Sequence, residues 1–308
     1  LEHDPTVFKD LPALPRFGET FETIGYYRKS DLKPAKDLKI LFRRIHHKLY
    51  GSGPIKREEN VAQEVIKVIF CKILDEKSPN EFCSFRATPS ELSTKEGNET
   101  VKQRVNTLYE ELLLDPDFGG LFKNEIIEYD SEWVTYIVSQ LQSVGLMHDE
   151  TNTDALGDAY EVLLPSSLKG ESGQFFTPRE VVRCAIEIIA PSFEKKEVIF
   201  DPACGSGGFL TVAIDYLKKS IEQAYEGRGF SNDRLASILK DHAGKYVHGS
   251  DIEPMLYKIA KSYMAIIGDG KSNIYNFDTL LPIENYPSHF KSKSESGDID
   301  IILTNPPF

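Results

Sequence analysis

Three short segments place polar side chains directly after apolar runs, where together they could bind a ligand. The first is DPACGSGG (201–208), which follows the apolar run EVIF (197–200). Glycines let the backbone approach a ligand closely, and the start of the helix that follows offers unpaired N–H donors. A plain tight turn is the alternative interpretation. A dinucleotide-binding G-x-G-x-x-G turn is disfavoured, because Leu210 stands where the third glycine is needed.

The second segment is HGSDIEP (248–254), at the end of the next apolar run. The carboxylate of Asp251 could accept hydrogen bonds from both hydroxyls of a ribose, and Ile252 could pack on an adenine ring. Glu253 fits the start of a helix, where an acidic residue is favoured. Asp278, which ends a further run, is a candidate acceptor for the exocyclic amine of adenine. Each Asp alone is also compatible with an ordinary loop acid.

The third segment is TNPPF (304–308), after the apolar run IDIIL. Two prolines after an asparagine remove backbone donors and rigidify the turn. The side-chain carbonyl of Asn305 and the backbone carbonyl of Pro306 could then both accept hydrogen bonds from one amine. Phe308 offers a face on which a planar base can stack. A rigid turn without chemistry is the alternative.

A fourth segment, GQFFTPRE (173–180), precedes the other three. The spacing of Thr177 and Glu180, with Pro178 between them, predicts a capping box with proline at the first helical position. A good helix start is therefore the simplest interpretation. Phe175 or Phe176 could in addition close over a cofactor.

The elements that position these segments follow from the hydrophobic pattern. Residues 1–30 are irregular, and apolar side chains at one-face helical spacing predict four helices between residues 31 and 150, with no comparable strand pattern. From residue 151 short apolar strands alternate with helices, which indicates a parallel sheet. The strands are expected at 197–200, 246–251, 272–278 and 298–304. The polar stretch 288–298 is expected to be a surface loop.

Composition limits the classes of function. The net charge of −12 gives no general basic excess, so any nucleic-acid contact must be local or supplied by a partner or a further segment. The basic run Arg43, Arg44, His46, His47 and Lys48 is either such a contact or the solvated face of an amphipathic helix. The four cysteines lack metal-ligand spacing and indicate buried or incidental thiols in a reducing cytoplasm, without a metal site. No apolar run is long enough to span a membrane, and the first ten residues lack the pattern of a secretory signal.

In combination and in order, these segments resemble the amino-methyltransferases that act on adenine in DNA, most closely the modification subunits of type I restriction systems. GQFFTP resembles the family's first cofactor motif, DPACGSGG its methionine-side motif, HGSDIEP its ribose motif and NPPF its catalytic tetrapeptide. The segment GDAYEVLL (157–164) resembles the helix that joins the helical and catalytic domains of those subunits. The resemblance covers residues 31 to 308.

The resemblance implies an α/β fold. Residues 151–308 would form a Rossmann-like S-adenosylmethionine-dependent methyltransferase core, preceded by an all-helical N-terminal domain in residues 1–150. The implied cofactor is S-adenosyl-L-methionine. The implied cofactor-binding residues are Gln174, Phe175, Phe176, Thr177, Pro178, Asp201, Pro202, Ala203, Gly205, Ser206, Gly207, Asp251, Ile252, Asp278 and Asn305, and the implied catalytic residues are Asn305, Pro306, Pro307 and Phe308.

The implied reaction is methyl transfer to N6 of a flipped-out adenine in double-stranded DNA, as the modification subunit of a restriction-modification system. The implied partners are a DNA-specificity subunit, a restriction subunit and a second modification subunit. Because NPPF ends the sequence, we expect the chain to hold the cofactor-binding half of the catalytic domain, with target recognition following it. Methyl transfer to RNA or to a protein glutamine is the alternative, as is a non-catalytic scaffold subunit.

Overall fold

The computed structural model describes residues 26–34, 38–55, 57–115, 118, 120–122, 125–147, 162, 177–267, 273–288, 290–291 and 297–306. The chain divides into two compact units, Leu1–Ala155 and Leu156–Phe308, and each is described by itself. None of the helices in these described ranges is long and apolar enough to cross a membrane. The predicted cofactor residues Gln174, Phe175 and Phe176, the predicted catalytic residues Pro307 and Phe308, and all of GDAYEVLL except residue 162 lie outside the described residues.

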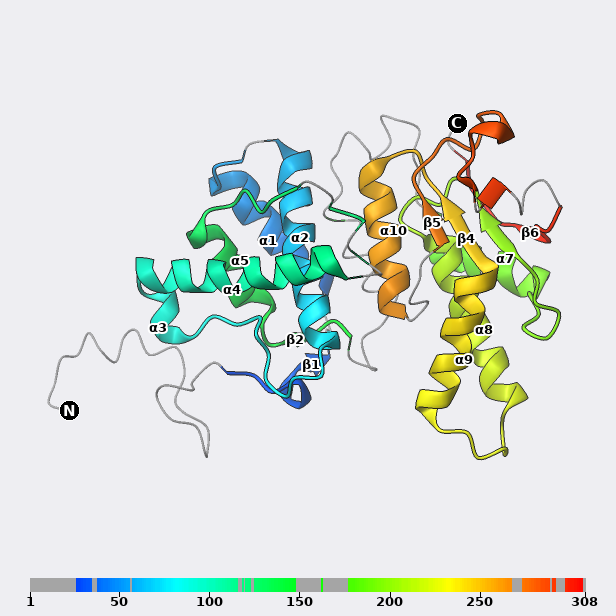
Figure 1. Cartoon of the computed structure of the whole chain (residues 1–308), viewed down its shortest axis with the longest axis horizontal. Coiled ribbons are helices and arrows are strands. Elements are labelled where there is room, and N and C mark those ends of the chain that lie inside the picture. The colour runs from blue at the N-terminus through cyan, green and yellow to red at the C-terminus, as the bar shows by residue number, and fades with distance from the viewer. Residues whose placement is uncertain are drawn as a thin grey trace, which may run out of the picture. The chain divides into compact units, whose positions relative to one another are not determined.

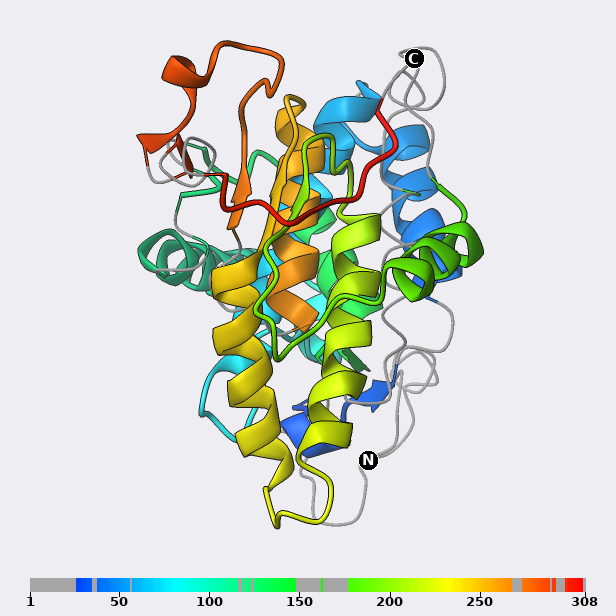
Figure 2. The ribbon, with the colours of Figure 1, turned by 90° about the vertical axis from the view of Figure 1, so that its right-hand side faces the viewer.

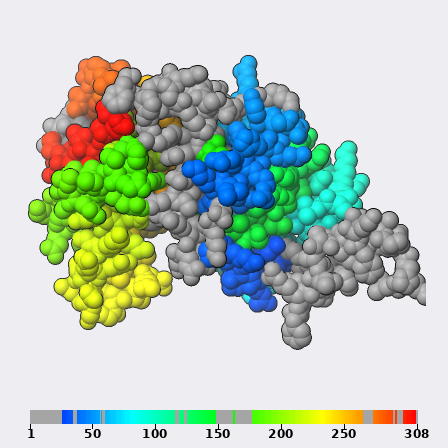
Figure 3. Space-filling model, turned by 180° about the vertical axis from the view of Figure 1, so that it is seen from behind, coloured from blue at the N-terminus to red at the C-terminus, as the bar shows by residue number. Residues whose placement is uncertain are grey.

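The N-terminal unit is built from helices around a central helix, α2 (Figure 1). After a 3-10 helix at Lys29–Asp31, its helices are α1 (Leu38–Ser52), α2 (Glu58–Lys77), α3 (Pro89–Leu92), α4 (Lys95–Leu114) and α5 (Ser131–Leu141). Helix α2 packs against α1, α4 and α5, and its apolar side chains other than Leu74 are completely buried. Helix α1, in blue, forms part of the face of this unit seen in Figure 3.

The four predicted helices correspond to α1, α2, α4 and α5. The unit also contains two short strands that the sequence pattern did not predict, β1 (Lys33–Pro34) and β2 (Val144–Gly145), which pair in parallel. Val144 continues the apolar spacing of Trp133, Ile137 and Leu141, which predicts that it belongs to the last helix, but it lies in β2. Two residues are too few to show the alternation from which a strand is predicted.

The C-terminal unit is a parallel sheet with helices packed against it. Its elements are α7 (Arg179–Ile189), β3 (Ile199–Asp201), α8 (Gly208–Ala224), α9 (Asn232–Tyr246), β4 (Val247–Ser250), α10 (Pro254–Ile267), β5 (Asn273–Tyr275), a 3-10 helix (Ile283–Asn285) and β6 (Ile301–Ile302). The strand order is β5-β4-β3-β6, and all neighbours in it are parallel. Figure 2 shows α8 and α9 side by side.

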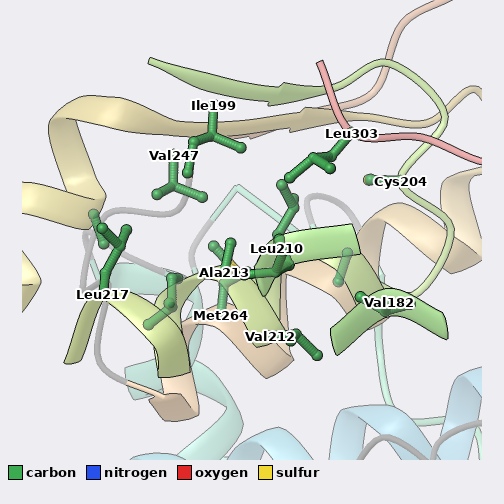
Figure 4. Packing of buried hydrophobic residues seen from close by; sticks show 14 of the residues in the cluster. Val182, Ile199, Cys204, Leu210, Val212, Ala213, Leu217, Val247, Met264 and Leu303 are labelled. Atoms are coloured by element: carbon green, nitrogen blue, oxygen red, sulfur yellow. The ribbon is translucent and has the colours of Figure 1, made fainter. Parts of the chain in front are cut away.

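Helix α8 supplies much of the core of this unit. Figure 4 shows Leu210, Ala213 and Leu217 facing Ile199 and Val247 of the sheet in the buried core. Side chains from α7, α9 and α10 complete the same cluster. Burial of this kind stabilises by about 25 cal/mol for each Å² of apolar surface. It therefore fixes the start of α8 against the ends of the strands, where the predicted site residues lie.

Two local predictions for this unit differ from the structure. Helix α9 was not predicted, because its many charged residues weaken the apolar periodicity from which a helix is predicted. The helix begins at Asn232, and the side chain of its N-cap residue Ser231 accepts a hydrogen bond from the Arg234 N–H. The stretch 288–298 was expected to be a surface loop, but Phe290 within it is completely buried. Phe290 contacts the rings of Phe200, Tyr275 and Phe277. Because its neighbours in the sequence are polar, the sequence pattern did not indicate that Phe290 is buried.

Candidate functional site

The predicted site residues gather where the parallel strands end. Asp201 ends β3, Asp251 follows β4, Asp278 follows β5, and Asn305 follows β6. Along the chain the strands move outward from β3 to β5, and β6 then returns to the other side of β3. Such a reversal of strand order opens a crevice at the carboxyl ends of the strands on either side of it, here β3 and β6, which is the usual ligand site of open α/β sheets.

A cavity of about 840 Å³ occupies this edge of the sheet, within the range of about 300–1,000 Å³ that is typical of ligand sites. Eleven of the predicted residues line it: Thr177, Asp201, Pro202, Ala203, Gly205, Ser206, Asp251, Ile252, Asp278, Asn305 and Pro306. Two others, Pro178 and Gly207, do not. The structure therefore brings together residues that are up to 129 positions apart in the sequence.

The glycine turn after β3 begins helix α8. Gly205 and Gly207 have φ angles of +55° and +88°, a conformation that costs other residues about 1–2 kcal/mol. Gly207 is the N-cap of α8, and its N–H donates to the Cys204 carbonyl over 2.8 Å. Gly207 thus contributes through its backbone conformation and not as part of the cavity wall.

Asp251 connects the end of β4 to this glycine turn. Its Oδ2 accepts the Gly205 N–H at 2.8 Å, and its Oδ1 accepts the Glu253 N–H at 2.9 Å. Burial raises the pKa of Asp251, and these two backbone donors oppose the rise. Each carboxylate oxygen has a second lone pair, so the group can accept further bonds from a ligand while it holds the turn. Ile252 beside it is 63% exposed at the cavity rim.

Asp201 is the most deeply buried acid of the cavity wall, with 1% of its surface exposed. Its Oδ1 accepts the Ala203 N–H at 3.1 Å, whereas Oδ2 has no hydrogen-bond partner. Burial raises the pKa of Asp201 to about 7. The Thr304 hydroxyl lies close enough to oppose this rise, although its geometry does not complete a hydrogen bond. A ligand with a positive charge or a strong donor would satisfy Oδ2.

The loop after β5 forms a wall of the cavity that the sequence analysis missed. Phe277, Leu280, Ile283 and Tyr286 line the cavity there, beside the half-buried Asp278. The loop is held in place because the Tyr286 hydroxyl donates to the Thr279 carbonyl at 2.6 Å, and the Thr279 hydroxyl donates to the Pro202 carbonyl at 3.0 Å. Apolar residues in a loop with a proline were the available signal, but nothing in their spacing separated them from core residues.

The capping box predicted at Thr177 is wrong. Helix α7 has Pro178 as its N-cap, without a side-chain cap, and the Val181 and Val182 N–H groups donate to the Pro178 carbonyl. Thr177 lies two residues before the helix, and its hydroxyl accepts a hydrogen bond from Nδ2 of Asn305 at 3.1 Å. Pro178 precedes the first helical residue, is exposed and does not line the cavity.

Arg179, the first residue of α7, also lines the cavity and was not singled out from the sequence. Its guanidinium donates to the Thr211 hydroxyl at 2.9 Å and to the Tyr263 hydroxyl at 3.2 Å. Arg179 is the only Lys or Arg among the described residues that line the cavity, which also holds three aspartates. A wall with this composition suits a ligand that is rich in hydrogen-bond donors and has a flat apolar part.

Comparisons with known proteins agree with this geometry. The sequence model of the N-6 DNA Methylase family matches residues 151–308. The MjaIX type I restriction enzyme methylase subunit of Methanocaldococcus jannaschii is 25% identical over 183 residues, which are 58% of this chain and 27% of that protein. The EcoEI type I methylase subunit of Escherichia coli is 30% identical over 155 residues, 49% of this chain and 27% of that protein. The chain therefore spans about a quarter to a third of the length of such relatives.

Solved structures show the same fold. A modification subunit assigned to a type I restriction enzyme of Vibrio vulnificus YJ016 superposes with a TM-score of 0.59 at 19% identity, over 90% of this chain and 61% of that one. The methyltransferase subunit of a type I restriction-modification system from Streptococcus thermophilus gives a TM-score of 0.50 at 16% identity, over 90% and 64%. Because the family match covers slightly more than half of the sequence and coincides with the unit that holds the cavity, the chain belongs to the N-6 DNA Methylase family.

Proposed function

We propose that the chain is the helical domain and the cofactor-binding half of a DNA adenine-N6 methyltransferase, the modification subunit of a type I restriction-modification system. The helical domain comprises residues 1–150 and the methyltransferase domain residues 151–308. The observation that supports this most directly is the cavity at the strand-order reversal, where the glycine turn, two further aspartates and Asn305 all meet. The family match covers the same unit.

The chemistry of the cavity wall fits S-adenosyl-L-methionine. This cofactor supplies a methyl group activated on a positively charged sulfonium, and it offers donors in its ammonium group, ribose hydroxyls and adenine amine. Asp251 would accept from the ribose hydroxyls and Asp278 from the adenine amine, with Ile252 against the adenine ring. The glycine turn would hold the methionine portion, near the unsatisfied Oδ2 of Asp201.

The chain's contribution to transfer would be to position the target amine. The Asn305 side-chain carbonyl and the Pro306 carbonyl would accept hydrogen bonds from N6 of the target adenine, and Phe308 would stack on the flipped-out base. Two acceptors at a rigid turn hold the amine nitrogen in one orientation, and such positioning can contribute several kcal/mol to a transfer reaction. No covalent nucleophile or metal is required of the chain.

DNA, a specificity subunit, a restriction subunit and a second modification subunit are the partners that follow from this assignment, which would place the protein with the chromosome in the cytoplasm. The exposed basic residues of α1 support a local DNA contact. Arg43, Arg44, His47 and Lys48 are exposed, and α1 carries no acidic residue. His46 is not part of this surface, because it is buried and stacks on Tyr50.

Calorimetric titration of S-adenosylmethionine into the chain tests the cofactor assignment. We expect wild-type binding, and binding at least about tenfold weaker in Asp251→Asn, because the amide lacks the charge and one acceptor. Asp241→Asn, an exposed site on α9, is the matched control and should bind like wild type. Circular dichroism confirms that each variant is folded. A folded wild-type chain that does not bind the cofactor would contradict the proposal.

Transfer of a tritiated methyl group to DNA, RNA and protein acceptors then tests the target. Transfer to unmethylated double-stranded DNA, lost in Asn305→Ala while cofactor binding is kept, is the expected result. Transfer to RNA or to protein, without transfer to DNA, would contradict the assignment of DNA as the methyl acceptor. If Asn305→Ala binds the cofactor and still transfers the methyl group at the wild-type rate, Asn305 does not position the target amine.

A further inference from the structure

The start of α7 connects two parts of the site that are far apart in the sequence. Thr177 accepts the hydrogen bond from Nδ2 of Asn305, 128 residues further along the chain. Two residues after Thr177, Arg179 contacts helices α8 and α10. Because only Pro178 separates them, and its ring fixes its own φ angle, the two contacts are mechanically coupled through a short, stiff segment.

Arg179 fastens this segment to two helices at once. One guanidinium nitrogen, Nη1, donates to the Gly208 carbonyl at 3.3 Å and to the Thr211 hydroxyl at 2.9 Å, both in the first turn of α8. The other, Nη2, donates to the Tyr263 hydroxyl of α10 at 3.2 Å, and the guanidinium lies 5.6 Å from the centre of the Tyr263 ring. Only a planar group with several donors in a fixed fork can make all of these contacts.

Thr177 acts on the group that would receive the target amine. The amide plane of an asparagine side chain turns easily, because its last torsion is broad. A hydrogen bond from Nδ2 to a fixed hydroxyl restricts that rotation and so restricts the direction of the Oδ1 lone pairs. Since an amine nitrogen must lie in line with the bond that breaks, a small rotation of its acceptor has a large effect on rate.

We propose that Thr177 and Arg179 are positioning residues: Arg179 fixes the start of α7 on α8 and α10, and Thr177 thereby orients the Asn305 amide. The inference rests on the proposed function for its catalytic consequence. The orientation itself is a property of the ligand-free chain. The glycine turn that begins α8 and the Asn305 turn after β6 are then held in register by one short segment.

The side-chain amide signals of Asn305 in the ¹H–¹⁵N spectrum of the ligand-free chain test the orientation directly. Asn305→Ala identifies them, because they disappear in that variant. Thr177→Val, which has the same shape without the hydroxyl, should shift them, and Thr177→Ser should restore them. Arg179→Lys should shift them too, because Lys keeps the charge but lacks the fork of donors that fixes the start of α7. Arg183→Lys, one turn further along α7 and exposed, should leave them unchanged.

Kinetics then separate positioning from cofactor contact. In methyl transfer to DNA, Thr177→Val should lower kcat by about tenfold to a hundredfold, with the KM for the cofactor nearly unchanged, and Thr177→Ser should recover most of the rate. Unshifted Asn305 signals in Thr177→Val, or a rise in KM without a fall in kcat, would overturn the inference. The spectrum needs no substrate, so its result is independent of whether DNA is the acceptor.

Discussion

At the scale of single residues, Asp201 shows that burial in the cavity wall makes a carboxyl group costly to ionise. It lies at the end of β3 with 1% of its surface exposed, so water cannot solvate a negative charge there. Burial raises the pKa of Asp201 to about 7, compared with 3.8 for a free side chain. Asp251 nearby adds to the effect. In the folded chain the group therefore keeps its proton at pH values at which the unfolded chain has lost it.

This shift predicts a stability that decreases as pH rises. Between about pH 4 and pH 7 the folded state binds more protons at Asp201 than the unfolded state, so the free energy of unfolding falls over that window and levels off above it. Asp201→Asn cannot ionise and should not show this loss. Relative to wild type, we expect the variant to gain roughly 2 to 3 kcal/mol of unfolding free energy between pH 5 and pH 8.

Urea unfolding of both proteins at pH 5 and pH 8 measures the difference. Trp133 is the only tryptophan of the chain and lies on α5 in the N-terminal unit, so its fluorescence follows that unit, whereas far-UV circular dichroism follows both. If the two units unfold independently, the change appears in the dichroism transition alone. Glu222→Gln, at an exposed position of α8, is the control. Equal pH dependence in wild type and Asp201→Asn would mean that Asp201 is ionised in the folded chain.

At the scale of elements, α1 allows a test between two interpretations of its basic residues. The helix buries Leu38, Phe42, Ile45 and Leu49 on one face, as an amphipathic helix does, and presents basic side chains on the other. A solvated helix face in an acidic chain would usually mix both signs of charge. The absence of any acid on α1 favours a contact with phosphates.

Replacing Arg43, Arg44 and Lys48 with Gln should weaken binding to double-stranded DNA and flatten its salt dependence. Each lost phosphate contact lowers the slope of log K against log salt by about 0.9, so three contacts would lower it by nearly 3. Fluorescence anisotropy over a salt series gives both quantities. The control replaces Lys218, Lys219 and Lys240, which are exposed on α8 and α9 and carry the same total charge. Equal losses in the two triple variants would show an effect of net charge only.

Elements with a strong local pattern could be predicted from the sequence, and long-range contacts could not. The glycine turn, the acid after β4 and the asparagine turn were found because each follows an apolar run, and the structure places all three on one cavity. The capping box at Thr177 failed for a different reason. Its spacing is that of a cap, but the hydroxyl is engaged by Asn305, and no local pattern reports a partner 128 residues away.

The order of the strands, like these long-range contacts, could not be predicted from local sequence patterns. Chain order alone would allow β6 to pair with β5 at the outer edge of the sheet, and the apolar run IDIIL is compatible with either position. The structure pairs β6 with β3, matching Ile199 with Ile301 and Phe200 with Ile302. This pairing creates the reversal that places Asn305 beside Asp201. The site thus depends on a topological choice that hydrophobic periodicity does not encode.

At the scale of the whole molecule, the cavity belongs to one of the two compact units. All of its lining residues lie between Thr177 and Pro306, within the unit Leu156–Phe308. A ligand that binds only the folded form of one unit stabilises that unit by mass action, by about 2.7 kcal/mol at a concentration of 100 Kd. If the two units unfold independently, the other unit gains nothing.

Hydrogen exchange followed by mass spectrometry, with and without S-adenosylmethionine, should therefore show slower exchange in the C-terminal unit only. At 100 Kd, amides of β3, β4 and α8 that exchange only by unfolding should slow by about a hundredfold, and those of α2 and α4 should not change. Local protection should also appear at the glycine turn and in the loop after β5. Asp251→Asn with the same cofactor concentration should show a slowing of at most about tenfold, because its Kd is expected to be at least about tenfold higher. Slowing of α2 and α4 in parallel with α8 would mean that the two units unfold as one, because the free energy of binding can reach the helical unit only through a shared cooperative transition.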